Sequence, residues 1–156
     1  MKTIKVKVYQ YSELNEKAQE KARNWFLEGN DFQIEWENIQ EDAKNVGVEL
    51  TAWDYNRNIE GELLLDFSQV MANIIKEHGK DCETHKTAKA YQKKYNALTE
   101  EQDEEKEELE QEFLQSILED YRIMADKQSD YIQSEEYIKE MMEANEYTFL
   151  EDGKRF

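Results

Sequence analysis

The chain has no proline, five glycines and one cysteine in 156 residues. Cys82 has no intramolecular partner, so a disulfide-stapled secreted scaffold is excluded and a reducing, cytoplasmic compartment is favoured. No run of eighteen apolar residues is present to form a membrane-spanning helix, and the first residues, which alternate lysine with apolar side chains, do not resemble a signal peptide. We therefore expect a cytoplasmic protein without a membrane segment, whose glycines mark helix ends.

Positive charge is also scarce, because the chain has 20 lysines and arginines against 37 acids, and its formal charge is −17. Direct binding to nucleic acid or to an anionic membrane needs a strong basic patch. The densest basic group is small against this charge; it consists of Lys86, Lys89, Lys93 and Lys94, with Lys80 nearby. We predict no direct contact with nucleic acid or membrane, and attraction of cationic partners.

The most prominent feature that is present is an acidic stretch leading into an amphipathic helix. Thirteen residues, 100–112, contain one base and nine acids, which are Glu100, Glu101, Asp103, Glu104, Glu105, Glu107, Glu108, Glu110 and Glu112. Apolar side chains then recur at three- and four-residue steps from Leu109 to Tyr121, the spacing of one helical stripe. We predict one long helix over about residues 98–127, with an acidic first half in water and an apolar second half in a core.

The rest of the chain mixes strand and helix patterns. Alternation with a period of two predicts strands at Thr3–Tyr11, Val48–Tyr55, Ile59–Phe67 and Tyr147–Leu150. Helical spacing predicts helices over about residues 16–28, 31–46, 68–78, 81–96 and from 134 onwards. We predict a single α+β domain over residues 1–156, in which four to six helices pack on one small, mainly antiparallel sheet. The apolar run Leu63–Leu65 favours a central position for the third strand.

The large aromatic residues gather in the first third of the chain. Trp25, Phe26, Phe32 and Trp36 have helical spacing across a short link, which predicts one core cluster. Trp53 falls on a strand, where it either packs in the core or forms an exposed binding patch, since tryptophan often anchors interfaces.

The sequence holds one candidate metal pattern and no catalytic motif. His78, Cys82 and His85 are spaced by four and three residues, which on a continuous helix would place three ligands on one face. Gly79 is expected to end that helix, so the spacing loses its geometric meaning. A glycine-rich phosphate loop, a nucleophile elbow and a His-Glu-x-x-His motif are all missing. We therefore assign no catalytic residue, metal or cofactor, and keep a small metal-dependent enzyme only as an alternative.

Both ends of the chain have a recognisable pattern. It consists of residues 9–26, YQYSELNEKAQEKARNWF, and residues 134–154, SEEYIKEMMEANEYTFLEDGK. These stretches resemble the opening and the close of a family of small proteins encoded by phages and prophages, some of them labelled antitoxin-like. Residues 85–96 resemble the middle of the family weakly. Family members often carry a Ser-Gly-Phe-Trp-Ser-Gln-Gly-Asp-Gly loop and an extra hairpin, which this chain replaces with residues 54–61 and the acidic stretch. The resemblance implies a phage origin and no mechanism.

The acidic stretch has two interpretations. A helix rises about 1.5 Å per residue, so nine acids in thirteen residues give about one charge per 2 Å, close to the one per about 1.7 Å of duplex DNA. The similarity concerns charge density only, and the simpler interpretation is a solvated helix end. Acids four residues apart repel one another by a few tenths of a kcal/mol per pair, which favours a use for the stretch.

Our leading hypothesis is a non-enzymatic, phage-type accessory protein whose nine acids bind a basic surface of a host protein. A nucleic-acid-binding defence enzyme, such as a CRISPR effector or a restriction enzyme, would be inhibited by mimicry of nucleic acid. The alternative is an antitoxin-like or oligomeric module, in which Leu109, Phe113, Ile117 and Tyr121 continue an apolar stripe across a homodimer interface.

Overall fold

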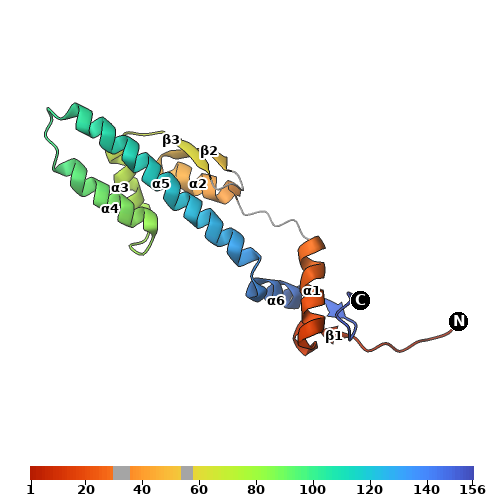
Figure 1. Cartoon of the computed structure of the whole chain (residues 1–156). Helices are drawn as coiled ribbons and strands as arrows, with labels where there is room; N and C mark the ends of the chain where they lie inside the picture. Colours follow the sequence, from red (N-terminus) through yellow and green to blue (C-terminus); the bar gives the residue numbers. More distant parts are fainter. Residues whose placement is uncertain (30–35, 54–57) are drawn as a thin grey trace. The chain divides into compact units, whose positions relative to one another are not determined.

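The computed structural model describes residues 1–29, 36–53 and 58–156, with the side chain of Trp53 left aside (Figure 1). These residues form six α-helices, one 3₁₀ helix and four strands, which confirms the predicted α+β class. The chain divides into two compact units, unit 1 (Met1–Ile34 and Gln128–Phe156) and unit 2 (Glu35–Lys127). The organisation of residues 1–156 as one domain stays a prediction. None of the described helices is both long and apolar enough to cross a bilayer.

Unit 1 combines the two ends of the chain. Its elements are β1 (Tyr9–Gln10), the 3₁₀ helix η1 (Tyr11–Glu13), α1 (Glu16–Gly29), the end of α5 (Asp103–Ile132), α6 (Glu135–Ala144) and β4 (Thr148–Phe149). β1 pairs antiparallel with β4, with Tyr9 opposite Phe149. Side chains cap two of the helices, since Asn15 Oδ1 accepts from the Ala18 N–H at 2.9 Å and Ser134 Oγ accepts the N–H at the start of α6.

The core of unit 1 lies between α1, α6 and β4. Four-residue spacing on α1 buries Ala18, Ala22 and Phe26, and these pack in one cluster with Phe149 and with residues of α6. Trp25 borders this cluster, and its ring centroid lies 5.4 Å from that of Tyr147. The two stretches that carry the phage resemblance therefore contribute to one core.

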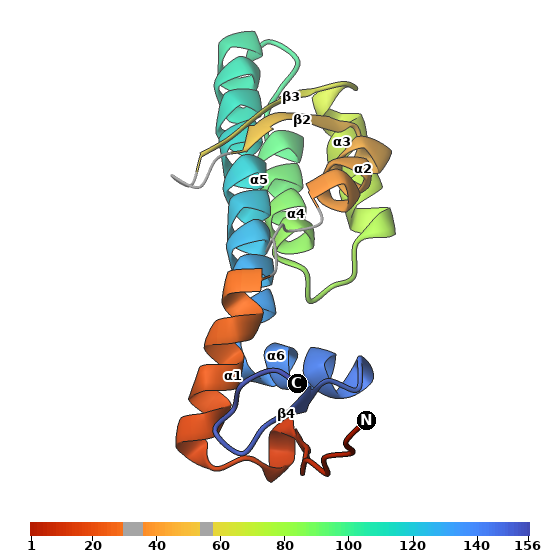
Figure 2. The same ribbon diagram turned by 90° about the vertical axis from the view of Figure 1, so that its right-hand side faces the viewer.

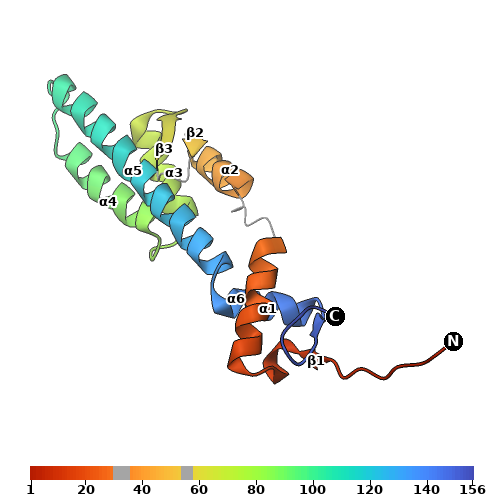
Figure 3. The same ribbon diagram turned by 45° about the vertical axis from the view of Figure 1, so that its right-hand side comes forward.

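Unit 2 surrounds the first four fifths of α5. Its other elements are α2 (Trp36–Val46), β2 (Val48–Trp53), β3 (Ile59–Leu63), α3 (Phe67–Glu77) and α4 (Glu83–Asn96). β2 and β3 form an antiparallel ribbon with Val48 opposite Leu63. α4 lies alongside α5, and α2 and α3 lie next to the ribbon (Figure 2). Figure 3 shows the same arrangement from an intermediate angle.

The middle of α5 is the centre of unit 2. Its buried side chains are Leu109, Phe113, Ile117, Leu118, Tyr121 and Ala125, as the helical spacing predicts. The Phe113 ring lies 5.0 Å from Phe67 of α3 and 5.7 Å from Tyr91 of α4, measured between centroids. Burial of each large apolar side chain stabilises the fold by about 1.5–3 kcal/mol.

The prediction of one sheet is wrong, because the strands form two separate two-stranded sheets. The predicted strand Thr3–Tyr11 is reduced to Tyr9–Gln10, which pairs with Thr148–Phe149. The third predicted strand ends at Leu63, and the next two leucines are 43% and 42% exposed instead of buried in a central strand. The predicted hairpin turn falls partly on residues 54–57, outside the described residues.

The predicted aromatic cluster stays a prediction, because part of it falls outside the described residues. Trp25 and Phe26 belong to the core of unit 1, whereas Trp36 begins α2 in unit 2. Phe32 lies outside the described residues, as does the side chain of Trp53.

We predict that Gly61→Ala destabilises the protein by about 1–3 kcal/mol, as overpacking does. A Cβ atom at Gly61 would lie 2.5 Å from the backbone oxygen of Glu49 and 2.9 Å from Leu118 Cδ2. Gly29→Ala is the matched control, since a Cβ atom there meets nothing within 4 Å. The free energy of unfolding in urea measures both variants, and equal values would contradict the close packing of the ribbon on α5.

Candidate functional site

The nine predicted acids lie at the start of α5 and in the turn before it. Glu100 and Glu101 occupy the turn, and the other seven lie on the first three turns of the helix. Eight of the nine are exposed and Glu110 is half-buried. In the described part of the chain, no lysine or arginine forms an ion pair with any of them. Their negative charge is therefore uncompensated on the surface of unit 2.

The start of α5 is fixed by local hydrogen bonds. The Thr99 N–H donates to Gln102 Oε1 at 2.8 Å, and the Lys106 N–H donates to the backbone oxygen of Gln102 at 3.1 Å. Asp103, Glu104 and Glu105 stand in the first turn, where negative charge interacts favourably with the helix dipole by about 0.3–1 kcal/mol each. The first-turn acids therefore have a structural role, and those of the later turns are the better candidates for partner binding.

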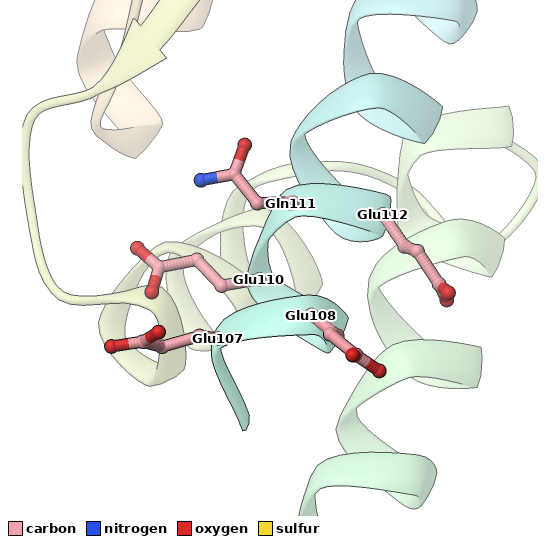
Figure 4. A pocket seen from close by; sticks show the side chains of 5 residues that line it. All are labelled: Glu107, Glu108, Glu110, Gln111 and Glu112. Carbon is pink, nitrogen blue, oxygen red and sulfur yellow. The ribbon is translucent and has the colours of Figure 1, made fainter. Parts of the chain in front are cut away.

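Six of the seven acids on the helix form two rows, with Glu104 between them, instead of the single line that linear charge density assumes. Steps of three and four residues define the rows; the first is Asp103, Glu107 and Glu110, and the second is Glu105, Glu108 and Glu112. Figure 4 shows the Glu107 and Glu110 side chains pointing to one side of the helix and those of Glu108 and Glu112 to another. These four line an open surface pocket together with Gln111. The whole pocket lies on α5 and offers carboxylates on both flanks.

The buried side of the helix separates the two rows and orients them. Leu109 and Phe113 anchor it in the core of unit 2 with exposures of 8% and 0%. The one base of the stretch, Lys106, is half-buried, and its Nζ lies 5.9 Å from the centroid of the Tyr95 ring on α4. Since that distance corresponds to a cation–π contact, Lys106 interacts with α4 while both rows of acids face solvent.

Unit 2 also contains a polar network that sequence reasoning missed. The Tyr121 hydroxyl donates to Asp42 Oδ2 at 3.1 Å, and His78 Nε2 lies 3.2 Å from the same oxygen without hydrogen-bond alignment. His78 Nδ1 is 2.6 Å from Thr84 Oγ1, and His85 Nδ1 is 2.8 Å from the backbone oxygen of His78. The network joins α2, α3, α4 and α5. Its one sequence signal is that Asp42 follows Ile39 by three residues, which places it beside the apolar stripe of α2.

The network shifts two pKa values in opposite directions. The His78 imidazole, aided by the Tyr121 hydroxyl, holds the pKa of Asp42 below its usual value against the opposing effect of burial. Burial and the nearby Asp42 charge raise the pKa of Tyr121 well above its usual range, so it stays a neutral donor. Outside the network, burial raises the pKa of the Asp120 carboxyl, and a 2.6 Å hydrogen bond from the Thr87 hydroxyl partly offsets this increase.

The candidate metal residues do not form a site in the described part of the chain. His78 and His85 contact protein groups of the network, and Cys82 is exposed before α4. α3 ends at Glu77, one residue before His78, which confirms the prediction that the helix ends before Gly79 and that the three residues do not share one continuous helical face. Among the described residues, no group of three histidine, cysteine or acidic side chains is placed to hold a metal ion.

Comparisons of the chain with protein-family models, with curated proteins and with solved structures find no match. The resemblance of its two ends to phage-encoded proteins therefore rests on the sequence pattern alone.

We predict that Asp42→Asn lowers the free energy of unfolding at pH 7 by less than about 1 kcal/mol, because polar contacts of a partly exposed carboxylate contribute little. The Asp42 side chain is 47% exposed. Because its pKa is lowered in the folded state from 3.8, its contribution is complete above the unfolded pKa and is lost as the pH falls through the folded pKa. Urea unfolding at several pH values should therefore show the two proteins converging in acid.

The neighbouring Glu41→Gln variant controls for the loss of one negative charge at an exposed position of α2. If Asp42→Asn and Glu41→Gln had the same stability from neutral pH into acid, the His78–Asp42–Tyr121 network would not stabilise the fold in the way described.

Proposed function

We propose that this protein is a phage-type accessory protein that acts in the cytoplasm of a host cell by binding a basic protein surface. The observation that carries the proposal is the pair of exposed, uncompensated carboxylate rows on α5. Its target is a nucleic-acid-binding protein, such as a CRISPR effector or a restriction enzyme, whose lysines and arginines normally contact phosphate groups. The protein inhibits that target by occupying its basic surface, and it performs no catalytic step.

The two rows favour a cleft over a flat surface as the binding site on the target. A cleft with basic residues on both walls would pair with Glu107 and Glu110 on one side of the helix and with Glu108 and Glu112 on the other. Each exposed ion pair contributes about 0.2–1 kcal/mol, so binding needs several pairs at once. The net charge of −17 also accelerates encounter with a cationic partner.

The anchoring of the helix supports this function energetically. The rows belong to a helix whose apolar side is buried in unit 2, so the backbone that carries the acids is ordered before binding. This preorganisation of the backbone reduces the entropy that is lost on binding. The antitoxin-like alternative loses its proposed surface, because Leu109, Phe113, Ile117 and Tyr121 are 8% exposed or less within unit 2.

We predict that the triple variant Glu107→Lys, Glu108→Lys and Glu112→Lys folds normally and loses the partner. These acids are exposed and lie beyond the first helical turn, so their reversal leaves the helix dipole interactions of the first turn in place. The immobilised chain should retain basic nucleic-acid-binding proteins from a bacterial lysate at about 0.1 M salt and release them at higher salt. The reason is that the screening length for exposed charges is about 10 Å at 0.1 M and becomes shorter as the salt concentration rises. Duplex DNA should displace these proteins, because it competes for the same surface.

The matched control is Glu77→Lys, Glu143→Lys and Glu151→Lys, which changes the net charge equally at exposed positions outside α5. Retention of the same proteins by the control variant and their loss from the α5 variant would support the proposal. Equal retention by both variants, or retention that DNA does not reduce, would refute it.

A further inference from the structure

The segment before β1 has the pattern of a strand, but no strand of the described residues pairs with it. Ile4, Val6 and Val8 alternate with Lys5 and Lys7, yet these residues lie outside β1 and are exposed. The three apolar side chains are 82%, 50% and 41% exposed. Figure 1 shows this segment as an extended trace that leads into β1. We call residues 3–8 the basic arm; residues 1–8 contain three lysines and no acid.

The β2–β3 ribbon of unit 2 has a complementary pattern. One face of the ribbon is apolar and packs inward, with Val48, Leu50 and Ile59 buried. The other face is acidic, and Glu49 stands directly opposite Glu62 with both side chains exposed. Like charges opposite each other on two strands destabilise a ribbon, and among the described residues neither glutamate forms an ion pair, although Lys44 lines a surface pocket with Glu49.

The outer edge of β3 is open to an additional strand. In the described residues β3 pairs with β2 alone, so its other edge presents backbone groups without a neighbouring strand. β3 has five residues, Ile59–Leu63, and the basic arm has six, so the lengths match. An extended segment that adds to such an edge gains backbone hydrogen bonds, while its alternating side chains decide specificity.

Two arms do not make a good pair with each other. Residues directly opposite in an antiparallel pair lie on the same face. A register that places apolar residues opposite apolar residues also places Lys5 or Lys7 opposite a lysine of the other arm, which is destabilising. A shift by one residue places lysine opposite isoleucine or valine and mixes the two faces. The arm therefore needs an acidic strand edge as its partner.

We propose that the basic arm of one copy of this chain adds as a third strand to the β3 edge of a second copy. Lys5 and Lys7 then lie over the acidic face that carries Glu49 and Glu62. Ile4, Val6 and Val8 continue the apolar face of the ribbon. The contact uses neither carboxylate row of α5, so it stands independently of the proposed inhibitory function.

The test is sedimentation equilibrium of the full-length protein and of two charge-reversed variants, the arm variant Lys5→Glu/Lys7→Glu and the edge variant Glu49→Lys/Glu62→Lys. The unaltered protein should self-associate, and each variant alone should associate at least about tenfold more weakly, since like charges then meet across the added strand. An equimolar mixture of the two variants should associate as the unaltered protein does, because both arm–edge contacts in the mixed pair regain opposite charges.

Three outcomes would overturn the proposal. The first is that the unaltered protein is a monomer at all concentrations, as it would be if the arm had no partner or bound its own chain. The second is that the edge variant alone associates normally, which would show arm–arm pairing. The third is that the mixture associates no better than either variant alone. Val6→Asp provides a further check, because Val6 is exposed in the single copy and its substitution leaves folding unchanged. This variant should also associate at least about tenfold more weakly, since a charge would enter the apolar face.

Discussion

Burial of the apolar side of α5 is the interaction on which the rest of unit 2 depends. Phe113, Ile117 and Tyr121 have no exposed surface, and each contributes about 1.5–3 kcal/mol by leaving water. The same burial places the two carboxylate rows on the solvent side of the helix. It also brings Leu118 against Gly61 of the ribbon and the Tyr121 hydroxyl against Asp42. The acidic surface, the ribbon and the polar network therefore all depend on one helical stripe.

Periodicity in the sequence predicted most helices, because the apolar face of a helix is a local property. The predicted long helix over residues 98–127 is observed at Asp103–Ile132, and its buried positions follow the predicted spacing. Pairing between strands was not predictable in this way. The alternation of residues 3–8 shows which side chains share a face, but it does not show that β4 has only two residues to pair with β1. The single predicted sheet failed for this reason.

The same distinction applies to the candidate site. The nine acids and their density are visible in the sequence, but the two rows depend on which side of the helix is buried. That side is set by Leu109 and Phe113 at the N-terminal end of the stripe. The network of Asp42, His78 and Tyr121 was beyond sequence reasoning, because it joins side chains that lie 36 and 43 residues apart in the chain and meet only when α2, the end of α3 and α5 pack together.

Like charges repel one another on both acidic surfaces of unit 2, and the two surfaces differ in the kind of partner that would relieve this repulsion. On α5, Glu104 and Glu108 are four residues apart on the helix, a spacing at which like charges repel. On the ribbon, Glu49 faces Glu62 across the strands. A cation relieves either repulsion, but the helix offers only side chains, whereas the edge of β3 also offers backbone groups to an extended chain. Salt should weaken binding at both surfaces, and only the ribbon requires its partner to form a β-strand. Different partners can therefore occupy the two surfaces of one chain.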